Sequence, residues 1–159
     1  MNHQSRVWIY QSNRILNSDE LEKISNKLSA FTKSWTAHNQ QLEATFEIKY
    51  NRFLILIVDE TQAGASGCSI DKSVHLMKEL EQQFQIDLFN RFNIAYKIGD
   101  EVQSVSREVF EELITKGEIT SDTIVFNNLV PDYGQYLEEW EVPFKDSWHA
   151  KVFKLKSVL

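Results

Sequence analysis

The chain has 159 residues, of which 42% are hydrophobic and 25% charged, and its net charge is −6. This composition is typical of one soluble globular domain, and the acidic balance disfavours nonspecific nucleic-acid binding, which needs a basic surface. No apolar run approaches the ~18 residues of a membrane span, and the first residues lack the apolar stretch of a secretory signal. One cysteine cannot form an internal disulfide, which fits a reducing compartment. We therefore expect a single cytoplasmic domain over residues 1–159, with no nucleic acid and no membrane among its partners.

The chain opens with a strand, a helix and a second strand. Arg6–Gln11 places apolar or aromatic residues on both faces, which indicates a strand that is covered on both sides. A helix over Ser18–Ser34 follows, with Asn17 as its N-cap and Glu20 as the capping-box partner. Residues 44–50 alternate between apolar and polar, which predicts a strand with one wet face.

The middle of the chain contains the most apolar strand. After a tight turn predicted at Asn51-Arg52, residues 53–58 (FLILIV) do not alternate, so this strand is expected to be buried on both faces. A second amphipathic helix is predicted from Ser69 onward, and residues 92–98 form another strand.

The order of these elements, over about residues 5–98, is the β-α-β-β-α-β pattern of a ferredoxin-like α+β fold. In that fold the first and third strands lie side by side in the middle of the sheet. These are the two strands here that lack alternation. The sequence therefore predicts Arg6–Gln11 and residues 53–58 as adjacent central strands, with both helices on one face.

Residues 99–159 are expected to extend this core with a hairpin, a third helix and an aromatic-rich tail. Gly99-Asp100 suits a Gly-first hairpin turn, and Ser106 suits the N-cap of the helix. The tail carries many aromatic residues that must pack on something: Tyr133, Tyr136, Trp140, Phe144, Trp148 and Phe153. The tail, or a partner subunit in a homodimer, is predicted to cover the second face of the sheet.

A loop of small residues before the second helix is the first candidate site. It contains Gly64, Ser66, Gly67 and Ser69, and small residues at a helix N-terminus let an anion approach free main-chain N–H groups. This pattern favours a small binding or interaction module whose partner is an anionic ligand or another protein. The alternative is a plain loop with Ser69 as the N-cap.

An enzyme built on the single cysteine is the second interpretation. Cys68 stands at the predicted helix N-terminus, where a thiol can act as a nucleophile. His75 lies on the same side of the helix, about two turns further on, and His149 could approach from the tail. No metal site is predicted, because a third ligand at suitable spacing is missing, and the sequence names no cofactor.

Nucleotide binding is the third interpretation. The buried strand ends in Asp59 and Glu60, as the metal-binding strand of a nucleotidase does. However, no G-x-x-x-x-G-K-[ST] phosphate loop precedes it, so ATP hydrolysis is not expected.

Several segments together resemble a family of small uncharacterised bacterial proteins that are often labelled "ABC transporter ATPase". They are RVWIYQSNR, YNRFLILIVDE, GASGCSIDKSVH, GEITSDTIVFNNLV and WEVPFKDSWHAKVF. The resemblance covers nearly the whole chain. It implies bacterial origin and, through the label, nucleotide binding without a Walker A loop, but it assigns no functional residue.

Overall fold

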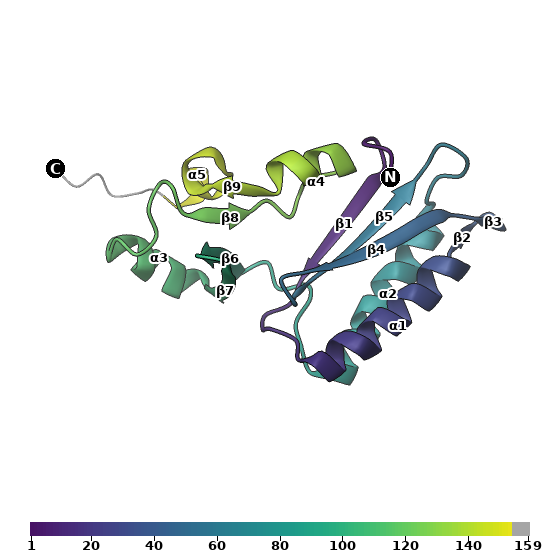
Figure 1. Cartoon of the computed structure of the whole chain (residues 1–159), viewed down its shortest axis with the longest axis horizontal. Coiled ribbons are helices and arrows are strands. Elements are labelled where there is room, and N and C mark those ends of the chain that lie inside the picture. Colours follow the sequence, from purple (N-terminus) through teal and green to yellow (C-terminus); the bar gives the residue numbers. More distant parts are fainter. Residues whose placement is uncertain (154–159) are drawn as a thin grey trace.

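The first layer of the fold is a three-stranded antiparallel sheet with two helices on one face (Figure 1). The computed structural model describes residues 1–153. The strands are β1 (Arg6–Gln11), β4 (Glu43–Lys49) and β5 (Phe53–Asp59), in the order β1-β5-β4, and the helices are α1 (Ser18–Ser34) and α2 (Gly67–Phe84). A short hairpin of β2 (Thr36–Ala37) and β3 (Gln40–Gln41) connects α1 to β4. The mixed α+β class predicted from the sequence is confirmed.

Strand β5 is buried on both faces, as its apolar run predicts. Its residues 53–58 are at most 1% exposed. Leu54, Leu56 and Val58 pack with α1 and α2, whereas Phe53, Ile55 and Ile57 belong to a second apolar cluster on the opposite face. Because both faces bury apolar surface, the sheet needs a second layer.

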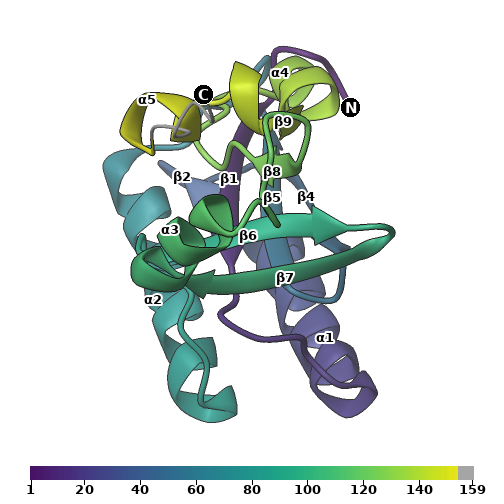
Figure 2. The ribbon, with the colours of Figure 1, turned by 90° about the vertical axis from the view of Figure 1, so that its left-hand side faces the viewer.

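The second layer is a four-stranded sheet that crosses the first at a steep angle (Figure 2). Its order is β7-β6-β8-β9, formed by β6 (Asn93–Ile98), β7 (Glu101–Ser106), β8 (Ile124–Phe126) and β9 (Glu141–Pro143). The helical segments beside it are α3 (Arg107–Thr115), α4 (Tyr133–Glu139), the 3-10 turn η1 (Phe144–Asp146) and α5 (His149–Val152). The aromatic tail does cover the second face, since Tyr136 and Trp140 pack with Phe53, and the Trp140 ring lies 4.9 Å from that of Phe53.

Two details of the expected sheet are wrong. β1 does pair with β5, but β1 is an edge strand rather than a central one, because β6 pairs with β7 and β8 in the second sheet. The reason is burial: Ala95 of β6 faces the first layer, while Ile94 and Tyr96 pack in a third apolar cluster. A place beside β1 would not bury these two residues in that cluster.

Two local boundaries also differ from the sequence prediction. Helix α2 begins at Gly67 rather than Ser69, because the Ser66 side chain accepts from the Ser69 N–H as the N-cap. The β4–β5 turn is centred on Tyr50 and Asn51, with φ of 54° and 55°, and the Arg52 N–H donates to the Lys49 carbonyl at 3.1 Å. Tyrosine is unusual in this left-handed conformation, and tertiary contacts hold it, since its hydroxyl donates to Glu141 Oε1 at 2.6 Å.

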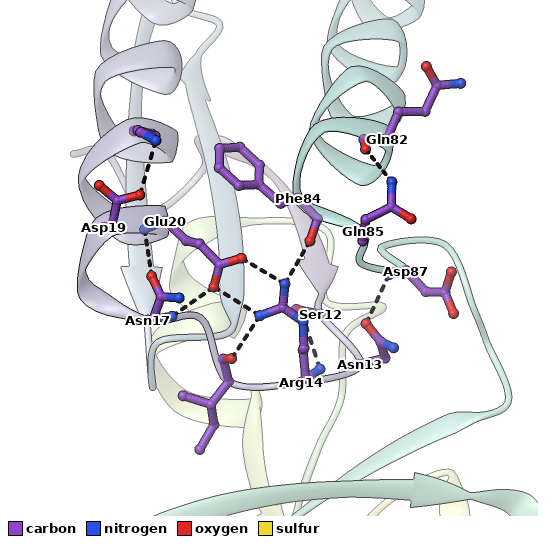
Figure 3. Close-up of polar contacts among 12 residues, drawn as sticks. Ser12, Asn13, Arg14, Asn17, Asp19, Glu20, Gln82, Phe84, Gln85 and Asp87 are labelled. Atoms are coloured by element: carbon purple, nitrogen blue, oxygen red, sulfur yellow. Dashed lines mark hydrogen bonds and ion pairs between the residues drawn. The ribbon is translucent and has the colours of Figure 1, made fainter.

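Arg14 links the start of α1 to the end of α2 through hydrogen bonds (Figure 3). Its guanidinium donates to Glu20 Oε1 and Oε2 at 2.9 and 2.7 Å, and to the Phe84 carbonyl at 2.6 Å. Beside it, Asn13 and Asp87 exchange two hydrogen bonds. These contacts fix the segment that follows α2, and the same segment forms one wall of the cavity described below.

Replacing Glu20 with glutamine should lower the free energy of unfolding at neutral pH by about 1 kcal/mol. The Arg14 guanidinium and the Asn17 N–H lower the pKa of the Glu20 carboxyl from 4.5 to about 2, so its stabilisation is present above pH 4.5 and is lost as pH falls toward 2. Glutamine still closes the capping box. Urea unfolding at neutral and acidic pH measures the difference, which should shrink below pH 4.5. Glu22→Gln on the exposed face of α1 is the matched control, and equal losses in both variants would contradict the role of Arg14.

Candidate functional site

A cavity opens between the two layers, beside strand β1. Its volume is about 430 Å³, within the size range of small-ligand sites. Its apolar lining includes Ile9, Phe89, Ile94, Leu129 and Trp148. Its polar lining consists of Gln11, Asn90, Arg91, Asn93, Asn128 and His149. The cavity therefore offers apolar surface together with several neutral hydrogen-bonding groups.

Three residues of β1, Ile9, Tyr10 and Gln11, line this cavity. Neighbouring residues of an antiparallel strand direct their main-chain groups to opposite sides. The Ser12 N–H donates to Arg52 on the β5 side, and the Val7 N–H donates outward to Pro131. The same alternation points the main-chain groups of Ile9 and Gln11 outward. Apart from the β1–β5 ladder, no hydrogen bond to these main-chain groups occurs within residues 1–153.

A series of side-chain hydrogen bonds connects the cavity walls. Gln11 Nε2 donates to the Asn93 carbonyl at 2.7 Å, and Asn128 Nδ2 donates to Gln11 Oε1 at 2.9 Å. Trp140 Nε1 in turn donates to Asn128 Oδ1 at 2.9 Å. These bonds link β1 to the start of β6 and to the segment after β8. Asn93 Nδ2 is buried without a hydrogen-bond partner among the described residues.

His149 contributes a neutral imidazole to the cavity. Burial lowers its pKa to about 4, so the ring is uncharged at neutral pH. The Ser147 hydroxyl oxygen lies 2.8 Å from the Phe144 carbonyl oxygen and 3.2 Å from His149 Nδ1. The Trp148 ring stacks on the imidazole, with 3.8 Å between the ring centroids.

Exposed apolar side chains surround the cavity mouth. Phe89 is 40% exposed, Leu129 77% and Trp148 37%. Phe92 and Val152, also exposed, line a smaller neighbouring cavity. Half of the large hydrophobic side chains exposed in the described chain thus gather around these two cavities, and such a concentration marks interaction sites.

The small-residue loop lies elsewhere, and the main-chain N–H groups of Ala65, Ser66 and Ser69 already have partners. The Ala65 N–H donates to Glu60 Oε2 at 2.8 Å. Ser66 and Ser69 cap each other through their hydroxyls and N–H groups. Gly64 lies against the same carboxylate, since a Cβ there would stand 3.1 Å from Glu60 Oε2. Glu60 thus occupies part of the space expected for an anion at residues 64, 66, 67 and 69, and that anion site remains a hypothesis.

The structure separates the three proposed catalytic residues. Cys68 is exposed in the first turn of α2. His75 is also exposed and pairs with Glu79 at 3.3 Å; it stands seven residues beyond Cys68, about 10 Å along the helix axis. His149 is buried in the second layer and lines the cavity, whereas Cys68 does not.

The carboxylate of Asp59 accepts from the Thr61 N–H at 3.0 Å, which lowers its pKa and assigns it a role in the turn after β5.

Residues 1–153 contain no group of three or more metal-ligating side chains arranged to hold an ion. No described helix is both long and apolar enough to cross a membrane. Comparisons with protein-family models, with curated proteins and with solved structures find no match to this chain. The arrangement of the cavity and of the β1 edge therefore provides the basis for a functional assignment.

Replacing His149 with glutamine should reduce the acid sensitivity of the fold. Burial lowers the pKa of His149 from 6.5 to about 4, so the unfolded chain binds this proton more tightly than the folded protein does. In the unmodified protein this group makes the free energy of unfolding fall between pH 6.5 and 4, by about 3 kcal/mol. Denaturant unfolding across that range should show a shallower slope in His149→Gln. The exposed His75→Gln serves as the control, and an unchanged slope in His149→Gln would contradict the assignment of a neutral buried ring.

Proposed function

We propose that this protein is an interaction module that binds an extended peptide segment of a partner protein as an added strand on β1. The observation that supports this most directly is that Ile9 and Gln11, whose main-chain groups point away from β5, both line an amphipathic cavity. Outward groups recur every second residue, about 7 Å apart, along a strand. An extended peptide has complementary N–H and C=O groups at the same spacing.

The lining of the cavity also suits a peptide. The side-chain amide of Asn90 can donate to a carbonyl group of a second chain. Phe89, Leu129 and Trp148 provide apolar surface on the cavity walls, where alternate side chains of a bound strand can pack. Main-chain pairing would supply affinity, and these walls would supply selectivity.

A second copy of this chain is a less favourable occupant of the same edge. The start of β1 is already paired, because Arg6 bridges to Asp132. The remaining edge lies within the cavity rather than on an open rim, flanked by residues 88–91, 128–129 and 148–149. If the β1 strands of two copies approached each other, the residues that flank each strand would clash before the strands could pair. A single extended segment is narrower and enters without this conflict.

Selection of a random peptide library on the purified protein should yield binders, and amide hydrogen exchange should show how they bind. In the free protein, the N–H groups of Ile9 and Gln11 should exchange faster than those of Trp8 and Tyr10, which point to β5. A selected peptide should slow exchange at Ile9 and Gln11, because both gain a hydrogen-bond partner. NMR-detected exchange with and without the peptide measures this directly.

Matched variants locate the binding surface. Leu129→Lys, at the cavity wall, should weaken binding of a selected peptide about tenfold or more, whereas Leu137→Lys on α4 should leave it unchanged; both leucines are largely exposed. The proposal fails if selected peptides leave the exchange of Ile9 and Gln11 unchanged. It also fails if these N–H groups are protected in the free protein and the protein sediments as a dimer, since a second copy would then occupy the edge.

A further inference from the structure

A second cavity continues from the first. Its volume is about 200 Å³, and it shares Arg91, Ile94 and Trp148 with the larger cavity. Its remaining lining is Phe92, Arg107, Val152 and Phe153. A ligand on the β1 edge that extends past Arg91 would therefore enter a subsite formed almost entirely by aromatic, aliphatic and arginine side chains.

The two arginines give this subsite a positive charge. Arg91 is exposed and lies at the junction of both cavities. Within residues 1–153 no carboxylate forms an ion pair with it. Arg107 is partly engaged, because its Nε lies 3.5 Å from Glu111 Oε1 and its guanidinium lies over the Phe153 ring at 5.3 Å. Arg91 thus provides the charge that remains available to a ligand.

We propose that the peptide bound on β1 carries an acidic side chain next to an apolar one, which Arg91 and the Phe92–Trp148 surface recognise. This inference rests on the peptide-binding function proposed above. An arginine guanidinium can bind a carboxylate through two parallel hydrogen bonds, and the adjacent rings can bury an apolar side chain. The rest of the protein strengthens the selectivity, because its net charge of −6 disfavours acidic segments where no arginine is available.

Parallel selections provide the test. A random peptide library is selected on the unmodified protein, on Arg91→Glu and on Lys72→Glu, and the retained peptides are sequenced. Lys72 is an exposed basic residue on α2 and controls for the change in net charge. The unmodified protein and Lys72→Glu should enrich peptides with aspartate or glutamate beside an apolar residue. Arg91→Glu should lose this preference and enrich lysine or arginine at the same position.

A selected acidic peptide then measures the effect on affinity. Its affinity for Arg91→Glu should fall about tenfold or more, and the version with lysine in place of the acid should bind Arg91→Glu more tightly than it binds the unmodified protein. Hydrogen exchange distinguishes a failure of the acidic specificity from a failure of the peptide-binding function. Peptides that protect Ile9 and Gln11 without any charge preference overturn the acidic specificity alone. If no peptide protects these N–H groups, the peptide-binding function fails.

Discussion

The whole architecture depends on the burial of strand β5 on both faces. A sheet strand with six consecutive apolar residues must be covered above and below, because each exposed side chain would forfeit roughly 1.5–3 kcal/mol of burial energy. Helices α1 and α2 cover one face, and the second sheet with α4 covers the other. The second layer is therefore part of the same core, since Phe53, Ile55 and Ile57 share an apolar cluster with its residues Ala95, Phe126 and Trp140.

This second layer also explains why β1 has a free edge. β6 leaves the first sheet because its residues are buried on both sides, between the first layer and the cluster around Phe110. The place beside β1 then stays without a partner strand. Exposed strand edges promote uncontrolled pairing with other chains, and proteins usually protect them. Here the Arg6–Asp132 bridge closes one end, and the rest of the strand borders the cavity.

The chemistry of the cavity suits the main-chain recognition proposed above. The groups that face it are mainly amides and a neutral imidazole, which donate and accept hydrogen bonds without a charge change at neutral pH. Arg91 is the exception. Because it lies at the junction of the two cavities, it would distinguish the ligand residue bound beside it from the residues bound elsewhere. Apolar rings beside these groups reduce the exposure of each hydrogen bond to water, which strengthens it.

The sequence by itself determined most of the first layer. The apolar run at residues 53–58, the capping box of Asn17 and Glu20 and the alternation after residue 43 are local patterns, and local patterns predict single elements well. The sequence also predicted that the aromatic tail, or a partner subunit, covers the second face. It could not place His149 relative to Cys68 and His75, because that depends on contacts between distant segments.

Only the tertiary structure decided that β6 joins the second sheet and that β1 becomes an edge. Strand pairing is a competition between similar apolar surfaces, and a strand carries no local mark of its partner. The cavity was hidden for the same reason. Its walls come from residues 9–11, 88–95, 126–129 and 148–149, four short segments without a shared motif, so their common function follows only from the way the two layers pack.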